Sequence, residues 1–162
     1  MQTLMILQLL FVLMVANGTP IIAKKFLGPV GAWPLDGGVA FLDGQPLFGP
    51  SKTLRGVLLS IVVTTVAAPI IGLSLSTGAM IAVGAMLGDL FSSFVKRRLG
   101  RVPSSRAIGL DQVPESLLPL LFCRTALDLT LVDIAVCVTA FFVCELVLSR
   151  ILYRLHVRDR PY

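Results

Sequence analysis

A glycine-rich segment, residues 33–56, brings cationic and hydroxyl side chains together at the start of an apolar run. Lys52, Thr53 and Arg55 follow a Gly-Pro turn, and Asp36 and Asp43 lie earlier in the segment beside glycines. Glycine lets a backbone approach an oxyanion closely, and Lys or Arg beside a hydroxyl suits phosphate. A helix that begins here would also offer free backbone amides to an anion. The segment predicts a phosphate site, although a glycine-rich turn with positive charge next to a membrane explains the composition equally well.

A second group of polar residues lies at the end of a later apolar run. Asp89, Ser92, Ser93 and Lys96 are spaced i, i+3, i+4 and i+7, which places them on one face of a helix. Ionisable groups inside a membrane segment are functional candidates by default. The end of a membrane span would explain the basic residues 96–98 but not the carboxylate of Asp89. We therefore predict a functional face here, with Asp111 and Gln112 opening the next apolar segment on the same side.

Three familiar kinds of site are excluded. The Gly44-x4-Gly49 spacing resembles a phosphate-binding P-loop, but Pro50 and Ser51 separate the second glycine from Lys52, and no strand precedes it. The single histidine, His156, lies in a basic tail, so no Ser/His/Asp or Cys/His arrangement and no zinc site can be assembled.

The composition indicates which elements must position these residues. The chain has 162 residues, of which 56% are hydrophobic and 14% charged, with a mean hydropathy of +0.89. Soluble domains carry about 25% charged residues. These values exclude a disordered chain, a nucleic-acid-binding domain and an ordinary water-soluble enzyme, and they predict an all-α integral membrane protein.

The apolar runs predict five transmembrane helices in a single domain over residues 1–162. Residues 56–88 carry no charge, and as one helix they would be about 50 Å long, against a hydrocarbon core of about 30 Å. The run must fold back, most naturally between Gly72 and Gly78. The weakest span contains three charged residues. The predicted spans are 2–23, 54–72, 76–95, 110–126 and 128–152.

The positive charges predict the orientation. With five spans and the N-terminus outside, segments 24–55, 96–106 and 150–162 face the cytoplasm and contain every Lys and Arg except Arg124. Four spans would place the arginine-rich tail outside. We expect a multi-pass protein of the cell (inner, cytoplasmic) membrane with a cytoplasmic C-terminus and two functional cytoplasmic loops.

Both polar segments resemble the CDP-archaeol synthase family, small membrane cytidylyltransferases related to phosphatidate cytidylyltransferase. The resemblance rests on Phe48-Gly-x-x-Lys-Thr-x-Arg-Gly56 and Gly88-Asp-x-x-Ser-Ser-Phe-x-Lys-Arg-Arg-Leu99. Order and spacing also agree at Ala16-Asn17, Pro34–Asp36, Phe41–Gly44 and Gly109–Gln112. Leu54 stands where the family has an aromatic residue, and residues 104–105 and 111–116 look more like a bacterial branch.

The resemblance implies transfer of CMP from CTP to a lipid phosphate, with release of pyrophosphate and a need for Mg²⁺, in phospholipid biosynthesis. The implied catalytic residues are Lys52, Arg55, Asp89, Lys96 and Asp111, with Asp89 and Asp111 holding the metal. The implied substrate-binding residues are Asn17, Asp36, Asp43, Thr53, Ser92, Ser93, Arg97, Arg98 and Gln112. The expected partners are CTP, a membrane lipid phosphate and the bilayer, and no nucleic acid.

Two alternatives compete with this interpretation. A CDP-alcohol phosphotransferase needs an Asp-x-x-Asp-Gly-x-x-Ala-Arg motif, which Asp36-Gly37 and Asp43-Gly44 do not satisfy. A non-enzymatic carrier of lipids or small solutes would explain the spans and Asp89, but it would not require the Lys-Thr-x-Arg-Gly segment.

Overall fold

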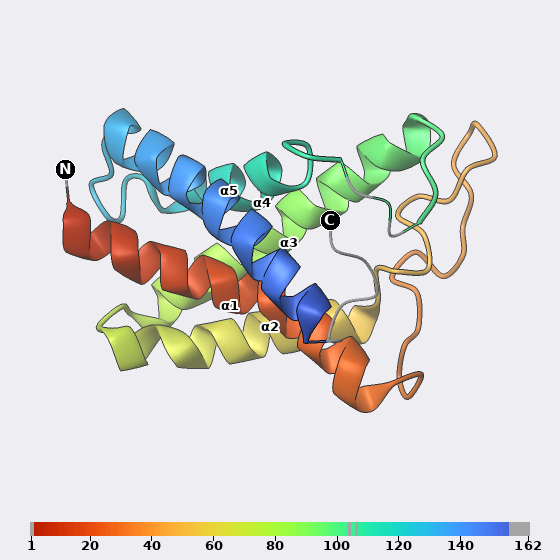
Figure 1. Cartoon of the computed structure of the whole chain (residues 1–162), viewed down its shortest axis with the longest axis horizontal. Coiled ribbons are helices and arrows are strands. Elements are labelled where there is room, and N and C mark those ends of the chain that lie inside the picture. The colour runs from red at the N-terminus through yellow and green to blue at the C-terminus, as the bar shows by residue number, and fades with distance from the viewer. Residues whose placement is uncertain (1, 104, 106, 156–162) are drawn as a thin grey trace.

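The computed structural model describes residues 2–103, 105 and 107–155, and these fold as a bundle of helices (Figure 1). The helices are α1 (Thr3–Leu27), α2 (Leu54–Ala67), the short 3₁₀ helix η1 (Ala68–Ile71), α3 (Leu75–Arg98), α4 (Gln112–Cys123) and α5 (Leu131–Arg154). Among the described residues the only strand-like pairings are two isolated bridges, Pro34 with Thr53 and Ala40 with Pro46. The prediction of an all-α protein is confirmed.

The helix boundaries follow local signals. Thr53, Ser74 and Thr130 cap α2, α3 and α5, each accepting a hydrogen bond from a backbone amide of the first turn. Pro69 begins the 3₁₀ turn that ends the second apolar segment, and Gly72 then adopts a left-handed conformation with φ 84°. The uncharged run therefore reverses within residues 72–74, at the start of the predicted turn.

In the part of the chain that the structure describes, four helical segments are long and apolar enough to cross a membrane: Thr3–Leu27, Leu54–Ile71, Leu75–Arg98 and Leu131–Arg154. Helix α4 has 12 residues rather than the predicted 110–126, which gives a length of about 18 Å. It is shorter because residues 107–111 form turns and the helix ends at Cys123, before the turn that leads to Leu129. Helix α1, in contrast, continues four residues beyond the predicted end, so that Lys24 and Lys25 lie in its last turn.

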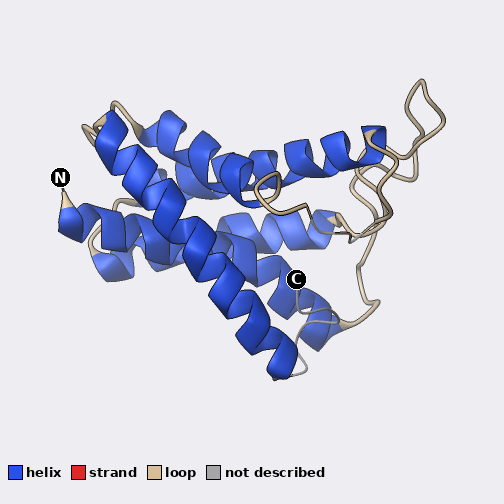
Figure 2. Ribbon diagram, turned by 45° about the horizontal axis from the view of Figure 1, so that its top comes forward, coloured by secondary structure: helices blue, strands red, loops and turns tan. Residues whose placement is uncertain are grey.

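Successive helices run in opposite directions, and the long loops gather at one end of the bundle (Figures 1 and 2). The amide of Gln2 donates to the carboxylate of Asp133, so α1 and α5 begin at the same end. The loops of residues 28–53 and 99–111 lie at the opposite end, which collects the polar residues singled out above.

The tightest helix packing in the described chain joins α3 to α4. A methyl group on Gly84 would lie 2.6 Å from the Cα of Pro119, and one on Gly88 would overlap the carbonyl of Pro114. Only glycine permits so close an approach of two helices. The contact presses the first turns of α4 against the half of α3 that carries Asp89.

Candidate active site

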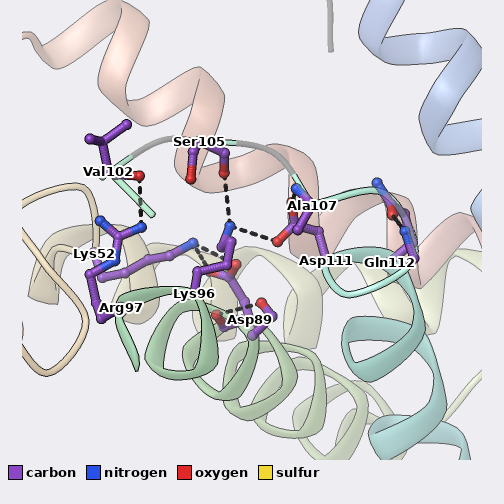
Figure 3. Close-up of polar contacts among 11 residues, drawn as sticks. Lys52, Asp89, Lys96, Arg97, Val102, Ser105, Ala107, Asp111 and Gln112 are labelled. Carbon is purple, nitrogen blue, oxygen red and sulfur yellow. Dashed lines mark hydrogen bonds and ion pairs between the residues drawn. The ribbon is translucent and has the colours of Figure 1, made fainter. Parts of the chain in front are cut away.

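Lys52 and Asp89, which are 37 residues apart in sequence, form an ion pair at the loop end of the bundle (Figure 3). The Lys52 Nζ lies 2.5 Å from each carboxylate oxygen of Asp89. Their side chains are 21% and 19% exposed, so the pair lies in a recess rather than on the surface. Lys52 precedes the cap of α2, and its backbone is fixed by bonds from its amide to the Gly49 carbonyl and from the Leu35 amide to its carbonyl.

Lys52 is positively charged over the whole physiological range. Burial by itself lowers the pKa of this ammonium, but attraction to Asp89, then to Glu115, and further to Asp111 more than offsets it. The net result is a pKa above the usual value of 10.5. The stability that this attraction contributes is fully present below about pH 10 and is lost only as the pH rises through the raised pKa.

A second ion pair joins Lys96 to Asp111, with 2.6 Å between Nζ and Oδ1. Lys96 also donates to the carbonyl of Ser105, and Asp111 Oδ2 accepts from the amide of Ala107 (Figure 3). The side-chain oxygen of Gln112 accepts from the amide of Gly109. These contacts fold the loop of residues 99–111 back onto α3. There Lys96 lies two helical turns after Asp89.

The predicted polar face of α3 is turned inward. Ser92, Ser93 and Lys96 are buried, and the Ser92 hydroxyl donates to the carbonyl of Asp89. Arg97 is 3% exposed and donates from Nη2 to the carbonyl of Val102. Its Nε and Nη1 are buried and have no hydrogen-bond partner in the part of the chain that is described. A buried guanidinium with unused donors is costly unless an anion completes it, and phosphate matches its geometry.

Asp36 organises the glycine-rich loop. Its carboxylate accepts hydrogen bonds from the amides of Gly38, Phe48 and Gly49 at 2.9–3.0 Å. Burial opposes ionisation of Asp36, but the three amides outweigh it and hold the pKa of this carboxyl below its usual 3.8. Asp36 is therefore an anion that shapes the turn leading to Lys52.

Arg98 fastens the same loop to α3. Its Nη2 donates to the carbonyls of Gln45 and Pro46, and its Nε lies 3.0 Å from the Asp43 carboxylate. The guanidinium also packs over the rings of Phe41 and Phe94, 4.8 and 4.9 Å from their centroids. These contacts of Asp36, Asp43 and Arg98 shape the loop and fasten it to α3, which gives the three residues a part in positioning Lys52.

Three other residues of the predicted site make their polar contacts elsewhere. The Arg55 guanidinium donates to the carbonyls of Val30 and Gly28, which holds the segment after α1. Asn17 donates to the carbonyl of Leu13 within α1. Thr53 serves as the cap of α2, accepting from the Gly56 amide. Residues 104 and 106, in one of the predicted loops, and 156–162 lie outside the described residues.

Glu115, one of the three charged residues in the predicted span 110–126, is not among the predicted site residues. Glu115 is 8% exposed, and its carboxyl lies within hydrogen-bonding range of the Asp89 carboxylate. A lone acidic residue in an apolar segment was the available signal. Within the described residues no three His, Cys, Asp or Glu side chains form a group that could by itself hold a metal. Mg²⁺ does not require such a group, because it is often held by one or two carboxylates together with substrate phosphates.

Comparison with known proteins gives a consistent picture. The family model described as CarS-like, CDP-archaeol synthase, matches residues 1–162. A CDP-archaeol synthase of Sulfurisphaera tokodaii is 30% identical over 92% of this chain and 90% of its own length. One from Pyrococcus furiosus is 39% identical over 60% of this chain. In that relative and the one from Hyperthermus butylicus, the matched part spans only 60% and 59% of the relative's length.

A solved structure described as an intramembrane enzyme for archaeal membrane lipid biosynthesis superimposes with a TM-score of 0.73. It is 31% identical in sequence, and the match covers 88% of this chain and 90% of the other. The resemblance noted in the two polar segments thus extends over the whole bundle. The protein belongs to the CDP-archaeol synthase family.

Proposed function

We propose that this protein transfers CMP from CTP to a membrane lipid phosphate and releases pyrophosphate, as a step in membrane lipid biosynthesis. The observation that carries the proposal is the largely buried ion pair of Lys52 and Asp89 at the loop end of α3, which also carries the buried guanidinium of Arg97 with its unused donors. Cations and an acid at the loop end of a membrane-spanning helical bundle suit two substrates: a charged nucleotide, and a lipid phosphate whose hydrocarbon tails stay in the bilayer. The names of the relatives support the same reaction.

In this reaction a lipid phosphate oxygen attacks the α-phosphorus of CTP, the new P–O bond forms, and pyrophosphate leaves in line. The protein contributes mainly positioning and charge neutralisation. Lys52, Lys96 and Arg97 would hold the phosphates, with Ser92 and Ser93 nearby on the same face of α3. Arg97 is pre-organised for this by its bond to Val102, which fixes one edge of the guanidinium and leaves the others for phosphate oxygens.

We further propose Mg²⁺ as the cofactor, with Asp89 and Asp111 as its predicted carboxylate ligands. Bound Mg²⁺ would neutralise triphosphate charge and strengthen pyrophosphate as a leaving group. Asp89 fits this role because its carboxylate is recessed and bonded to a flexible lysine. Asp111 fits less well, since Lys96 and the Ala107 amide already engage it.

We also propose that the chain crosses the membrane five times. Helices α3 and α5 run in the same direction, so the segment between them must return to the other end, with α4 as the helical part of that crossing (Figure 1). In this arrangement both long loops face the cytoplasm, where CTP is found, and the protein resides in the cytoplasmic membrane.

The test is a transfer assay with purified protein in lipid nanodiscs, Mg²⁺ and labelled CTP. Nanodiscs contain either a diacylglycerol phosphate or an isoprenoid diether phosphate, which identifies the lipid class. We expect label in the lipid fraction together with equimolar pyrophosphate, and a loss of about ten- to hundredfold or more in Asp89→Asn, which retains the shape of the side chain. A carrier would consume no CTP with either lipid, and that result would reject the proposal for a protein shown to be monodisperse.

A further inference from the structure

The close contact of α3 with α4 brings a second carboxyl group beside Asp89. A methyl group on Gly88 would lie 2.7 Å from the Cα of Glu115, so the backbone of α4 passes directly against the residue before Asp89. Glu115 is 8% exposed, and its carboxyl reaches the Asp89 carboxylate.

Two adjacent carboxyl groups in a recess need a cation or a shared proton between them, because like charges at this separation repel strongly. The cation present is the ammonium of Lys52, which contacts both oxygens of Asp89 and is attracted to Glu115 as well. Lys52 comes from a loop on a long, flexible stem, whereas both acids come from helices that are packed together. The rigid part of the arrangement is therefore the acid pair, and the cation is the movable part.

Asp111 lies in a different setting. Lys96 and the amide of Ala107 each bind one of its oxygens, and these bonds hold the loop of residues 99–111. Using Asp111 as a metal ligand would break that loop anchor. With Glu115 as the second metal ligand, the metal ion would only replace the Lys52 ammonium beside Asp89.

We infer that Asp89 and Glu115 together form a divalent-cation site, and that the ammonium of Lys52 takes the place of the cation when the site holds no metal. This inference rests on the proposed function for its purpose but not for its test. A metal nucleotide would displace Lys52 from Asp89 and free it for a phosphate oxygen. Arg97 of α3 is buried with unused donors, and its side chain lies beside Gly49, in the loop that carries Lys52. These donors point to such an anionic ligand.

The exchange makes an unusual prediction, because removing a cationic side chain should improve metal binding. In Lys52→Met the acid pair loses its neutralising charge, so Mn²⁺ should bind without nucleotide roughly ten- to hundredfold more tightly than it does to wild type. Mn²⁺ binding is measured by electron paramagnetic resonance of the free ion, with full-length protein in detergent and neither CTP nor lipid present. The gain should disappear in Lys52→Met/Glu115→Gln and persist in Lys52→Met/Asp128→Asn, a control at the other end of the bundle.

Each outcome decides the inference. Equal affinity of Lys52→Met and wild type would overturn it, as would a gain that survives Glu115→Gln or that Asp111→Asn abolishes instead. If Lys52→Met is not monodisperse, Lys52→Gln is the substitute. A second comparison measures Mn²⁺ affinity in the presence of CTP for wild type and for Glu115→Gln, and equal affinities would overturn the inference. Since the first titration contains no substrate, a metal gain with no CMP transfer would leave this site standing and reject the proposed function alone.

Discussion

At the scale of single residues, the proposed nucleotide binding is expected to depend most on Lys52. Its backbone is fixed within the loop, while its ammonium sits in a recess and is charged at neutral pH. We expect Lys52→Met to weaken binding of CTP with Mg²⁺ by about ten- to hundredfold, since a charge-assisted hydrogen bond is worth roughly 1.5–3 kcal/mol. Isothermal titration measures this, with Lys24→Met in the last turn of α1 as the matched control. Unchanged CTP affinity in Lys52→Met would contradict the assignment of this residue to the triphosphate.

At the scale of elements, the α3–α4 contact controls the site because it sets how closely α4 packs against α3. We expect Gly88→Ala to lower the free energy of unfolding by about 1–3 kcal/mol and to reduce CMP transfer, since the new methyl group would meet backbone atoms of Pro114 and Glu115. Helix propensity alone predicts the opposite sign, a gain of up to about 1 kcal/mol. Thermal unfolding in detergent measures the difference. Gly18→Ala is the control, because a methyl group there would have no heavy atom within 4 Å.

The glycine-rich loop is a second element, and Arg98 is one of the residues that fasten it to α3. Arg98 binds two carbonyls of the loop and Asp43, and its guanidinium packs over the rings of Phe41 and Phe94. We expect Arg98→Met to speed hydrogen exchange of the amides in residues 38–49 and to raise the KM for CTP, because Lys52 loses its fixed position. Hydrogen-exchange mass spectrometry reads the loop directly, with Arg101→Met as the control. Protection equal to wild type would show that Arg98 is not needed to hold the loop.

At the scale of the whole molecule, the orientation in the membrane decides which substrates reach the site. In a background lacking Cys123, Cys137 and Cys144, we expect Thr125→Cys to react with an impermeant maleimide in intact cells, and Ser51→Cys to react only after permeabilisation. The two positions lie at opposite ends of the bundle, in exposed turns. Labelling of both positions from the same side would rule out the five-crossing arrangement. The reversed labelling pattern would show that the protein has the opposite orientation in the membrane.

The sequence by itself determined the helical membrane character, the fold-back near Gly72, the shared polar face of α3 and the two segments that carry the family resemblance. These are local properties: apolar runs, helix caps and helical spacing depend on residues within a few turns of one another. It also predicted Asp36, Asp43 and Arg98 for substrate binding; in the structure Asp36 accepts hydrogen bonds from loop amides, and Arg98 of α3 binds Asp43 and two loop carbonyls.

Only the tertiary structure decided that Lys52 meets Asp89, that Lys96 meets Asp111, and that Glu115 joins the first pair. Those partners depend on how closely α4 approaches α3, which Gly84 and Gly88 permit but which no sequence spacing expresses. The length of α4 was also beyond the sequence, because an apolar run does not distinguish a helix from the turns at residues 107–111 and 124–129 that replace its ends. Helical periodicity places a side chain on a face, but the packing of two helices determines what that face meets.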